Sequence, residues 1–107
     1  MNKRPERIKI ISKRFVVKYV PEGEGEITEE KMGLCDTLNQ VIWIEEGLQY
    51  DTQKETLIHE TFHAVSDEMG ANLSEEQVTL MAKGVLAMLM DNPTFARYLM
   101  KKEKGTK

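Results

Sequence analysis

Residues 59–63 read His-Glu-Thr-Phe-His, and both histidines of the 107-residue chain lie in this segment. Two histidines four positions apart on a helix lie one turn apart on the same face, so both imidazole rings can reach one ion. This HExxH pattern is typical of zinc-dependent peptidases. We therefore expect Zn²⁺ bound by His59 and His63, with Glu60 as the general base that takes a proton from water.

Two plainer interpretations compete with catalysis. The histidines could be solvated side chains on a helix face, or they could hold a metal that only stabilises the fold. In the second case the chain is a regulatory module that binds a partner through an exposed strand or through helices rich in methionine, at Met81, Met88 and Met90. Hydrolysis is preferred because both histidines of the chain fall in one motif together with its glutamate.

A catalytic zinc site needs a third protein ligand, and without another histidine it must be a carboxylate. The segment after Gly70 has an apolar helical face made by Val78, Met81, Ala82, Val85, Leu86 and Leu89. Glu75 projects close to the centre of that face, whereas Glu76 projects about 100° away from it. Because a carboxylate that points into a core is costly unless it is paired or metal-bound, Glu75 is the preferred ligand and Glu76 the second candidate. Both are also first-turn acids that complement a helix dipole.

Four other side chains have weaker claims to a role in the site. Asp67 lies one turn beyond His63 and could orient its ring, but it could equally be a solvated helix residue. The candidates to stabilise a transition state, on chemistry alone, are Tyr50, Tyr98 and Arg97.

The single cysteine, Cys35, cannot form an internal disulfide, which favours a reducing, cytoplasmic setting. It is interpreted as a small strand or core residue rather than a nucleophile, because no third histidine is present to activate it.

The first half of the chain has the composition of strands. Residues 7–20 are rich in β-branched and aromatic side chains, with a polar break at 12–14, which predicts two short strands or one bent strand ended by Pro21. Residues 34–36 and 41–44 flank a turn at 37–39 and predict a hairpin.

The second half predicts helices. A capping box at Thr52-x-x-Glu55 predicts that the helix with the HExxH motif runs from about Gln53 to Met69, with Gly70 as its C-terminal cap.

A second capping box, Ser74-x-x-Gln77, predicts a helix to about Met90, and Asn92-Pro93 predicts a third to about Lys102. Strands followed by helices indicate an α+β fold, in which a short antiparallel sheet packs on two or three helices. A chain of this length is expected to form a single domain over residues 1–107.

Charge is unevenly distributed along the chain, whose net charge is −3. Residues 1–21 carry seven bases and one acid, residues 22–76 carry fifteen acids and two bases, and residues 97–107 are basic again. The acidic middle argues against nucleic acid as a partner. No apolar run approaches the roughly 18 residues of a membrane span, and the N-terminus lacks the apolar run of a signal peptide.

Residues 34–93 resemble the ImmA/IrrE-like metallopeptidases, particularly short phage-type members. In that family a strand precedes the HExxH helix, and a second helix supplies a glutamate ligand in a pattern like E-x-x-A-x-x-F-A-x-x-L-L. This chain matches the pattern as Glu75-x-x-Val78-x-x-Met81-Ala82-x-x-Val85-Leu86. The resemblance implies a zincin-like fold with Glu75 as the third zinc ligand.

The resemblance also implies how substrate binds. Strand Val41–Ile44 is similar to the family's edge strand beside the cleft, which pairs with an extended substrate peptide. Relatives cleave repressor proteins, so a regulatory protein is the expected kind of substrate. An SprT-like protease associated with nucleic acid is a third interpretation, which the acidic middle of the chain weakens.

Overall fold

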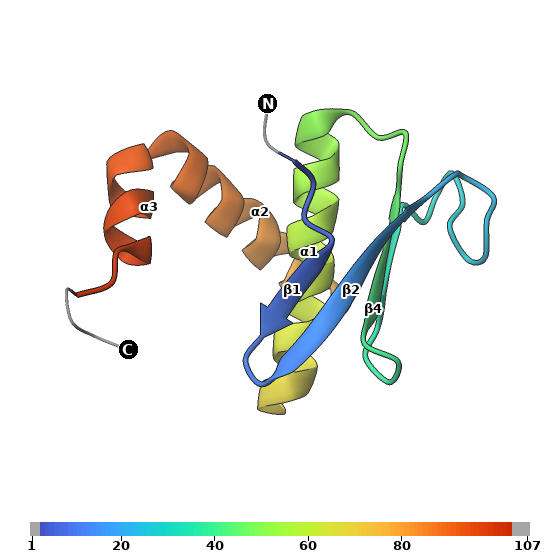
Figure 1. Ribbon diagram of the computed structural model, residues 1–107, viewed down its shortest axis with the longest axis horizontal. Helices are drawn as coiled ribbons and strands as arrows, with labels where there is room; N and C mark the ends of the chain where they lie inside the picture. The colour runs from blue at the N-terminus through green and yellow to red at the C-terminus, as the bar shows by residue number, and fades with distance from the viewer. Residues whose placement is uncertain (1–2, 104–107) are drawn as a thin grey trace.

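The computed structural model describes residues 3–103. Its elements are β1 (Arg7–Ile10), β2 (Lys13–Val20), β3 (Gly33–Asp36), β4 (Val41–Glu45), α1 (Tyr50–Met69), α2 (Glu75–Asp91) and α3 (Pro93–Met100). Four strands precede three helices, so the predicted α+β class is confirmed (Figure 1). Within the described residues, no helix is long and apolar enough to cross a membrane.

The sheet is mixed, with the strand order β1-β2-β4-β3. Its two hairpins, β1–β2 and β3–β4, are antiparallel as expected. The prediction of a wholly antiparallel sheet is wrong at the centre, where β2 and β4 pair in parallel from Val16↔Val41 to Val20↔Glu45. The reason is that the second hairpin places its later strand beside β2, so that β3 is left at the edge.

Strand β4 is therefore central, and the expectation that Val41–Ile44 forms the edge beside the cleft is wrong. Ile42 and Ile44 are fully buried, because β4 is paired on both sides and covered by a helix on one face. Strands β1 and β3 form the two edges of the sheet, and the four residues of β3 pair only with β4.

Helix α1 lies against one face of the sheet and supplies its main cover (Figure 1). Ala64 is buried against the sheet residues Ile42 and Ile44, with Leu57 and Val65 at the margin of this core. The small Ala64 side chain allows the helix to approach the sheet closely. The apolar residues of the helix that face the core follow the spacing of one helix face. This face of α1 is thus the one that contacts the sheet.

The start of α1 differs from the prediction. The helix begins at Tyr50, and Gln49 at the N-cap makes no side-chain cap hydrogen bond. The expected capping box does not form because Thr52 is already inside the first turn, where its carbonyl oxygen accepts from Thr56 Oγ1 at 2.8 Å. The end of the helix is as predicted, with Gly70 in the left-handed conformation at φ 64°.

The capping box of α2 is confirmed. The Gln77 N–H donates to Ser74 Oγ at 3.1 Å, and the Ser74 N–H donates to Gln77 Oε1 at 2.8 Å. Beyond α2, Pro93 occupies the first turn of α3 as predicted, but the helix ends at Met100 rather than Lys102. Asn92 does not cap α3, because its Nδ2 donates to the carbonyl of Met88 instead.

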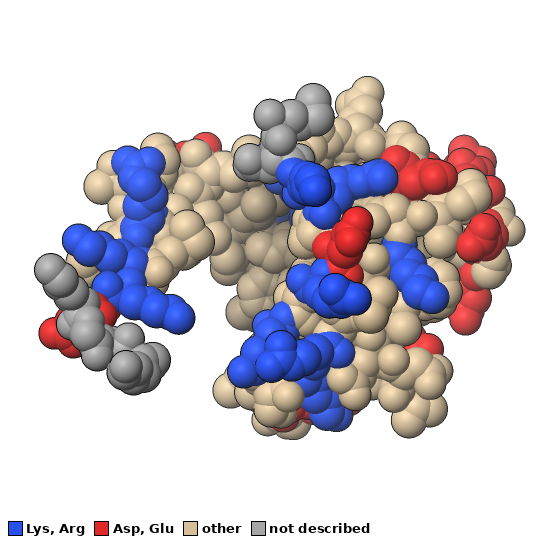
Figure 2. All heavy atoms as spheres, viewed as in Figure 1, with Lys and Arg blue, Asp and Glu red and all other residues tan. Residues whose placement is uncertain are grey.

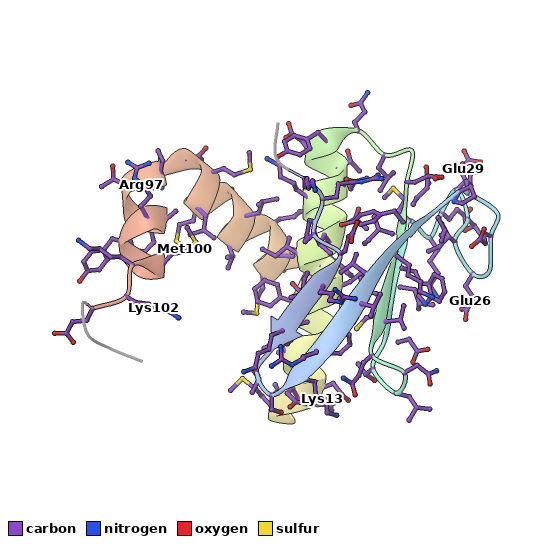
Figure 3. All side chains as sticks on the ribbon, in the orientation of Figure 1. Lys13, Glu26, Glu29, Arg97, Met100 and Lys102 are labelled. Carbon is purple, nitrogen blue, oxygen red and sulfur yellow. The ribbon has the colours of Figure 1, made fainter. Side chains whose placement is uncertain are left out.

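The α2–α3 end of the molecule projects away from the sheet (Figures 1 and 3). Among the described elements α3 contacts only α2, and it has no buried residue. Arg97, Met100 and Lys102 all lie on this projection, far from α1 in Figure 3.

The two capping motifs give a matched test of the fold. Ser74→Ala removes a hydroxyl that accepts the Gln77 N–H, and it should lower the free energy of unfolding by about 1 kcal/mol. Thr52→Ala removes a hydroxyl that caps nothing, and it should change that free energy by less than about 0.5 kcal/mol. Urea unfolding followed by circular dichroism measures both. Equal losses would contradict the observed cap assignments.

Candidate metal centre

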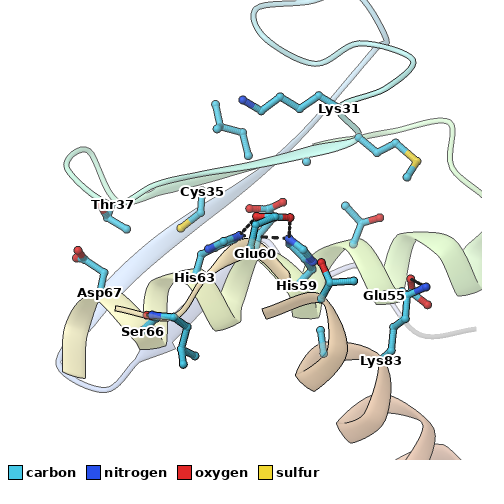
Figure 4. A pocket seen from close by; sticks show the side chains of 18 of the residues that line it. Lys31, Cys35, Thr37, Glu55, His59, Glu60, His63, Ser66, Asp67 and Lys83 are labelled. Carbon is cyan, nitrogen blue, oxygen red and sulfur yellow. Dashed lines mark hydrogen bonds and ion pairs between the residues drawn. The ribbon is translucent and has the colours of Figure 1, made fainter. Parts of the chain in front are cut away.

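A cleft of about 820 Å³ lies between β3, α1 and the first turns of α2 (Figure 4). The HExxH residues His59, Glu60 and His63 line it from α1, and Glu75 lines it from α2. Strand β3 contributes Gly33, Leu34 and Cys35 from the sheet's free edge. The polar stripe of α1 therefore faces a cavity.

The two histidines and Glu75 meet at one point of this cleft. Glu75 Oε2 lies 2.8 Å from His59 Nε2, and Glu75 Oε1 lies 2.8 Å from His63 Nε2. The two Nε2 atoms are 3.2 Å apart, and the dashed lines in Figure 4 mark these contacts. One ligand atom from each residue lies within 4.8 Å of the other two, so the trio could hold a metal ion.

The spacing and chemistry of this trio fit Zn²⁺. Bonds of about 2.0–2.1 Å from zinc to nitrogen or oxygen, in a tetrahedron, place neighbouring ligand atoms roughly 3.3 Å apart. The observed separations of 2.8 and 3.2 Å are close to that edge length. Two imidazoles and one carboxylate also leave the fourth position open, as catalytic zinc requires.

The turn between α1 and α2 carries Glu75 to the histidines. Gly70 reverses the chain in the left-handed conformation, and the buried Ser66 Oγ accepts the Leu73 N–H at 2.9 Å. Ser74 then caps α2, so that Glu75 is its first residue. The turn, the side-chain hydrogen bond and the helix cap thus fix the path of the chain across the twelve positions that separate His63 from Glu75.

The structure places the preferred carboxylate at the histidines, but the burial argument that selected it is wrong. The Glu75 side chain is 70% exposed rather than buried in the core. The reason is that α2 first meets the core at Val78, one turn later, so the first turn lies over the open cleft. Glu76 does not line the cleft.

Glu60 lies beside the histidines without joining their contacts, and it is only 7% exposed. Burial and, to a smaller extent, the charge of Glu75 raise the pKa of its carboxyl to about 7, while the charge of Lys31 acts in the opposite direction. A cation held by the neighbouring ligands would lower this pKa, because it favours the carboxylate form.

Gly33 in β3 allows the sheet edge to approach Glu60. A Cβ at position 33 would lie 2.7 Å from Thr56 Cγ2 and 3.0 Å from Glu60 Oε2, closer than side chains pack. Sequence reasoning missed Gly33, and also the supporting Ser66. Neither lies in a motif, and their neighbours are distant in the chain.

Cys35 and Asp67 line the cleft without the features of reactive groups. Burial, followed by the charge of Glu60, raises the pKa of the Cys35 thiol to about 12, so the thiol stays protonated and is a poor nucleophile. Asp67 makes no hydrogen bond to His63 among the contacts of residues 3–103, so the expected orienting role has no support.

The three suggested transition-state donors do not line the cleft. Arg97 and Tyr98 lie on α3, which contacts only α2, and Tyr50 is the first residue of α1. Within the described chain, the cationic side chains that line the cleft are those of Lys31 and Lys83.

No family model, curated protein or solved structure matches this chain in the three comparisons. The resemblance noted from its motifs therefore stays a prediction, and its function is argued from the site itself.

The close approach at Gly33 can be tested against a second glycine. Gly33→Ala should lower the free energy of unfolding by about 1–3 kcal/mol, because the new methyl group overlaps Thr56 and Glu60. Gly84→Ala, in the interior of α2 with open space around its Cβ, should raise that free energy by about 0.5–1 kcal/mol. Urea unfolding measures both changes, and stabilisation by Gly33→Ala would contradict the packing of β3 on α1.

The raised pKa of Cys35 predicts slow alkylation in the folded protein. At pH 8 the unfolded thiol, with a pKa of about 8.5, is roughly a quarter thiolate, whereas the folded thiol is almost wholly protonated. Iodoacetamide should therefore modify the native protein at least about 100-fold more slowly than the protein in urea. Because folding favours the neutral thiol, the fold should also lose stability as pH rises above the unfolded pKa. Similar alkylation rates in both states would refute the assignment.

Proposed function

We propose that this chain is a zinc-dependent metallopeptidase. The observation that supports it most is the convergence of His59, His63 and Glu75, which place one ligand atom each within 4.8 Å of one another. A buried glutamate lies beside that trio, and a free strand edge borders the same cleft. These are the parts that peptide hydrolysis needs: a metal site with an open position, a proton acceptor and a place for an extended backbone.

His59 and His63 would bind the ion through Nε2, and Glu75 would bind it through a carboxylate oxygen. A zinc ion held in this way supplies a Lewis acid and makes water acidic near neutral pH. The two α1 ligands are preorganised because they lie one turn apart on a rigid helix. Glu75 reaches them through the capped start of α2, which limits its freedom.

Glu60 would act as the general base. Its carboxylate would accept a proton from the attacking water and pass it to the leaving amine. The backbone of β3 at Gly33 packs against the Glu60 side chain and excludes solvent from it. Fixed orientation and a dry setting both favour proton transfer over exchange with bulk water.

The substrate would be a protein or peptide segment in extended conformation. One edge of β3 pairs with β4, while the N–H and C=O groups of the other edge are free along the cleft. A peptide can add to such an edge as another strand, because its backbone completes the unpaired ladder. This pairing would draw a peptide along the cleft past Glu60.

Metal content and cleavage, measured on three single variants, test this function. Purified protein should contain stoichiometric zinc and cleave members of a fluorescence-quenched peptide library. Glu60→Gln should keep the zinc and lose at least roughly 100-fold in cleavage, because only the proton acceptor is removed. Glu75→Ala should lose both, since a ligand is removed.

Glu76→Ala is the matched control, because this neighbouring acid does not line the cleft and should leave zinc and cleavage unchanged. Absence of bound zinc in the native protein would refute the proposal. A different result would favour the alternative, a zinc-stabilised module that binds a protein partner. In that case the native protein would bind stoichiometric zinc, but it would show no cleavage, or cleavage that Glu60→Gln does not reduce.

A further inference from the structure

The outer face of the sheet, opposite α1, carries a group of basic side chains. Strand alternation directs Ile8, Ile10, Phe15 and Val17 inward to the core. The intervening residues point outward, and the exposed cations among them are Arg7, Lys9, Arg14 and Lys18. We call these four side chains the basic face. Figure 2 shows basic side chains gathered over β1 and β2 in this view.

The charges of the basic face are uncompensated. Lys9 and Arg14 lie directly opposite each other in the β1–β2 register, an arrangement of like charges that destabilises a sheet. None of the ion pairs formed within residues 3–103 includes any member of the basic face. The repulsion would be relieved by an anion bound across the two strands.

An aromatic ring lies next to these cations. Trp43, the chain's one tryptophan, points outward from β4 between the inward Ile42 and Ile44. It lies opposite Lys18 in the parallel register, with the Lys18 ammonium 5.3 Å from the ring centroid. Together with the outward Val16 on β2, the ring forms an apolar strip beside the cations.

The acids of the loop between β2 and β3 lie apart from the basic face. Glu26 and Glu29 are on the loop after β2, at the far side of the molecule from α3 (Figure 3), and red acidic side chains cluster there in Figure 2. Two other acids, Asp36 and Glu45, are exceptions, because alternation along β3 and β4 directs them to the same outer face as Trp43. Glu6, just before β1, is the acid nearest to these cations in sequence.

We propose that the basic face binds single-stranded nucleic acid. Phosphates would contact the four cations, and a base would stack near Trp43, which is the combination that single-strand binding surfaces use. Stacking on an aromatic ring needs a base whose face is free, which a single strand offers and an intact duplex does not. An anionic membrane suits it less, because peripheral membrane binding typically uses an amphipathic helix with large apolar side chains, whereas this surface is a sheet face with a single aromatic ring.

This site is independent of the cleft. The HExxH residues lie on α1, against the inner face, while the basic face is on the other side of the sheet. A nucleic acid strand and a peptide could therefore be bound at the same time.

Trp43 fluorescence provides the test, because the only tryptophan lies within the proposed site. Titration with an oligodeoxythymidylate of about 12 nucleotides should quench it with saturation. Four phosphate contacts predict that affinity falls about 50-fold between 50 and 200 mM salt. Duplex of the same length and vesicles of anionic phospholipid should quench it much less. No quenching, or stronger binding of either competitor, would overturn the proposal.

Variants locate the binding. Lys9→Glu with Arg14→Glu should weaken oligonucleotide affinity at least about tenfold, because two phosphate contacts become repulsive. Lys101→Glu with Lys102→Glu makes the same change in net charge beyond α3 and should leave affinity unchanged within about twofold. The neutral pair Lys9→Gln with Arg14→Gln should also weaken oligonucleotide binding. Because this pair removes the repulsion between the two opposed cations, its loss of affinity cannot come from unfolding. Equal weakening by both glutamate pairs would mean general attraction rather than this face, and would refute the site.

Discussion

The packing of α1 against the inner face of the sheet is the contact on which the rest of the structure depends. Ala64 lies on Ile42 and Ile44, and its small side chain sets the close distance between helix and sheet. Once that face is buried, rotation of the helix is fixed, so the HExxH stripe must lie toward the free edge at β3. A cleft then forms where the sheet ends and the helix continues.

The candidate metal centre combines groups of very different exposure, and each suits its chemistry. Glu75 is exposed and can adjust its carboxylate, whereas Glu60 is enclosed between α1 and the β3 backbone. Burying a carboxyl costs free energy, which shows in the raised pKa of Glu60. Keeping such a group beside two histidines lowers the stability of the fold, and under the proposed function this buried carboxyl is the proton acceptor.

The two faces of the sheet divide the molecule into regions of different chemistry. The inner face carries the core and, through α1, the histidines, while the outer face carries cations around Trp43. Alternation along β1 and β2 produces both faces from one stretch of chain. Of the seven bases near the N-terminus, four therefore lie together on the outer face of the sheet.

Local signals in the sequence predicted what depends on near neighbours. The spacing of His59 and His63, the Gly70 cap and the Ser74 capping box are all confirmed because each involves residues within one helical turn. The capping box predicted at Thr52 does not form, because α1 begins at Tyr50 and Thr52 already lies inside its first turn. Glu75 lies at the histidines, although the burial argument that selected it among the acids is contradicted by its exposure.

Only the tertiary structure decided which strand forms the edge and what lies above Glu60. Pairing of β4 with β2 requires contact between residues about 25 positions apart, and no local pattern specifies such a partner. The same holds for Gly33. A side chain at this position would overlap Thr56 and Glu60, which lie on α1 and are distant in the chain. The sequence by itself determined that His59, Glu60 and His63 share one stripe of a helix, since helix geometry is local. Its surroundings, from the β3 edge to the exposed Glu75, depend on how distant segments pack together.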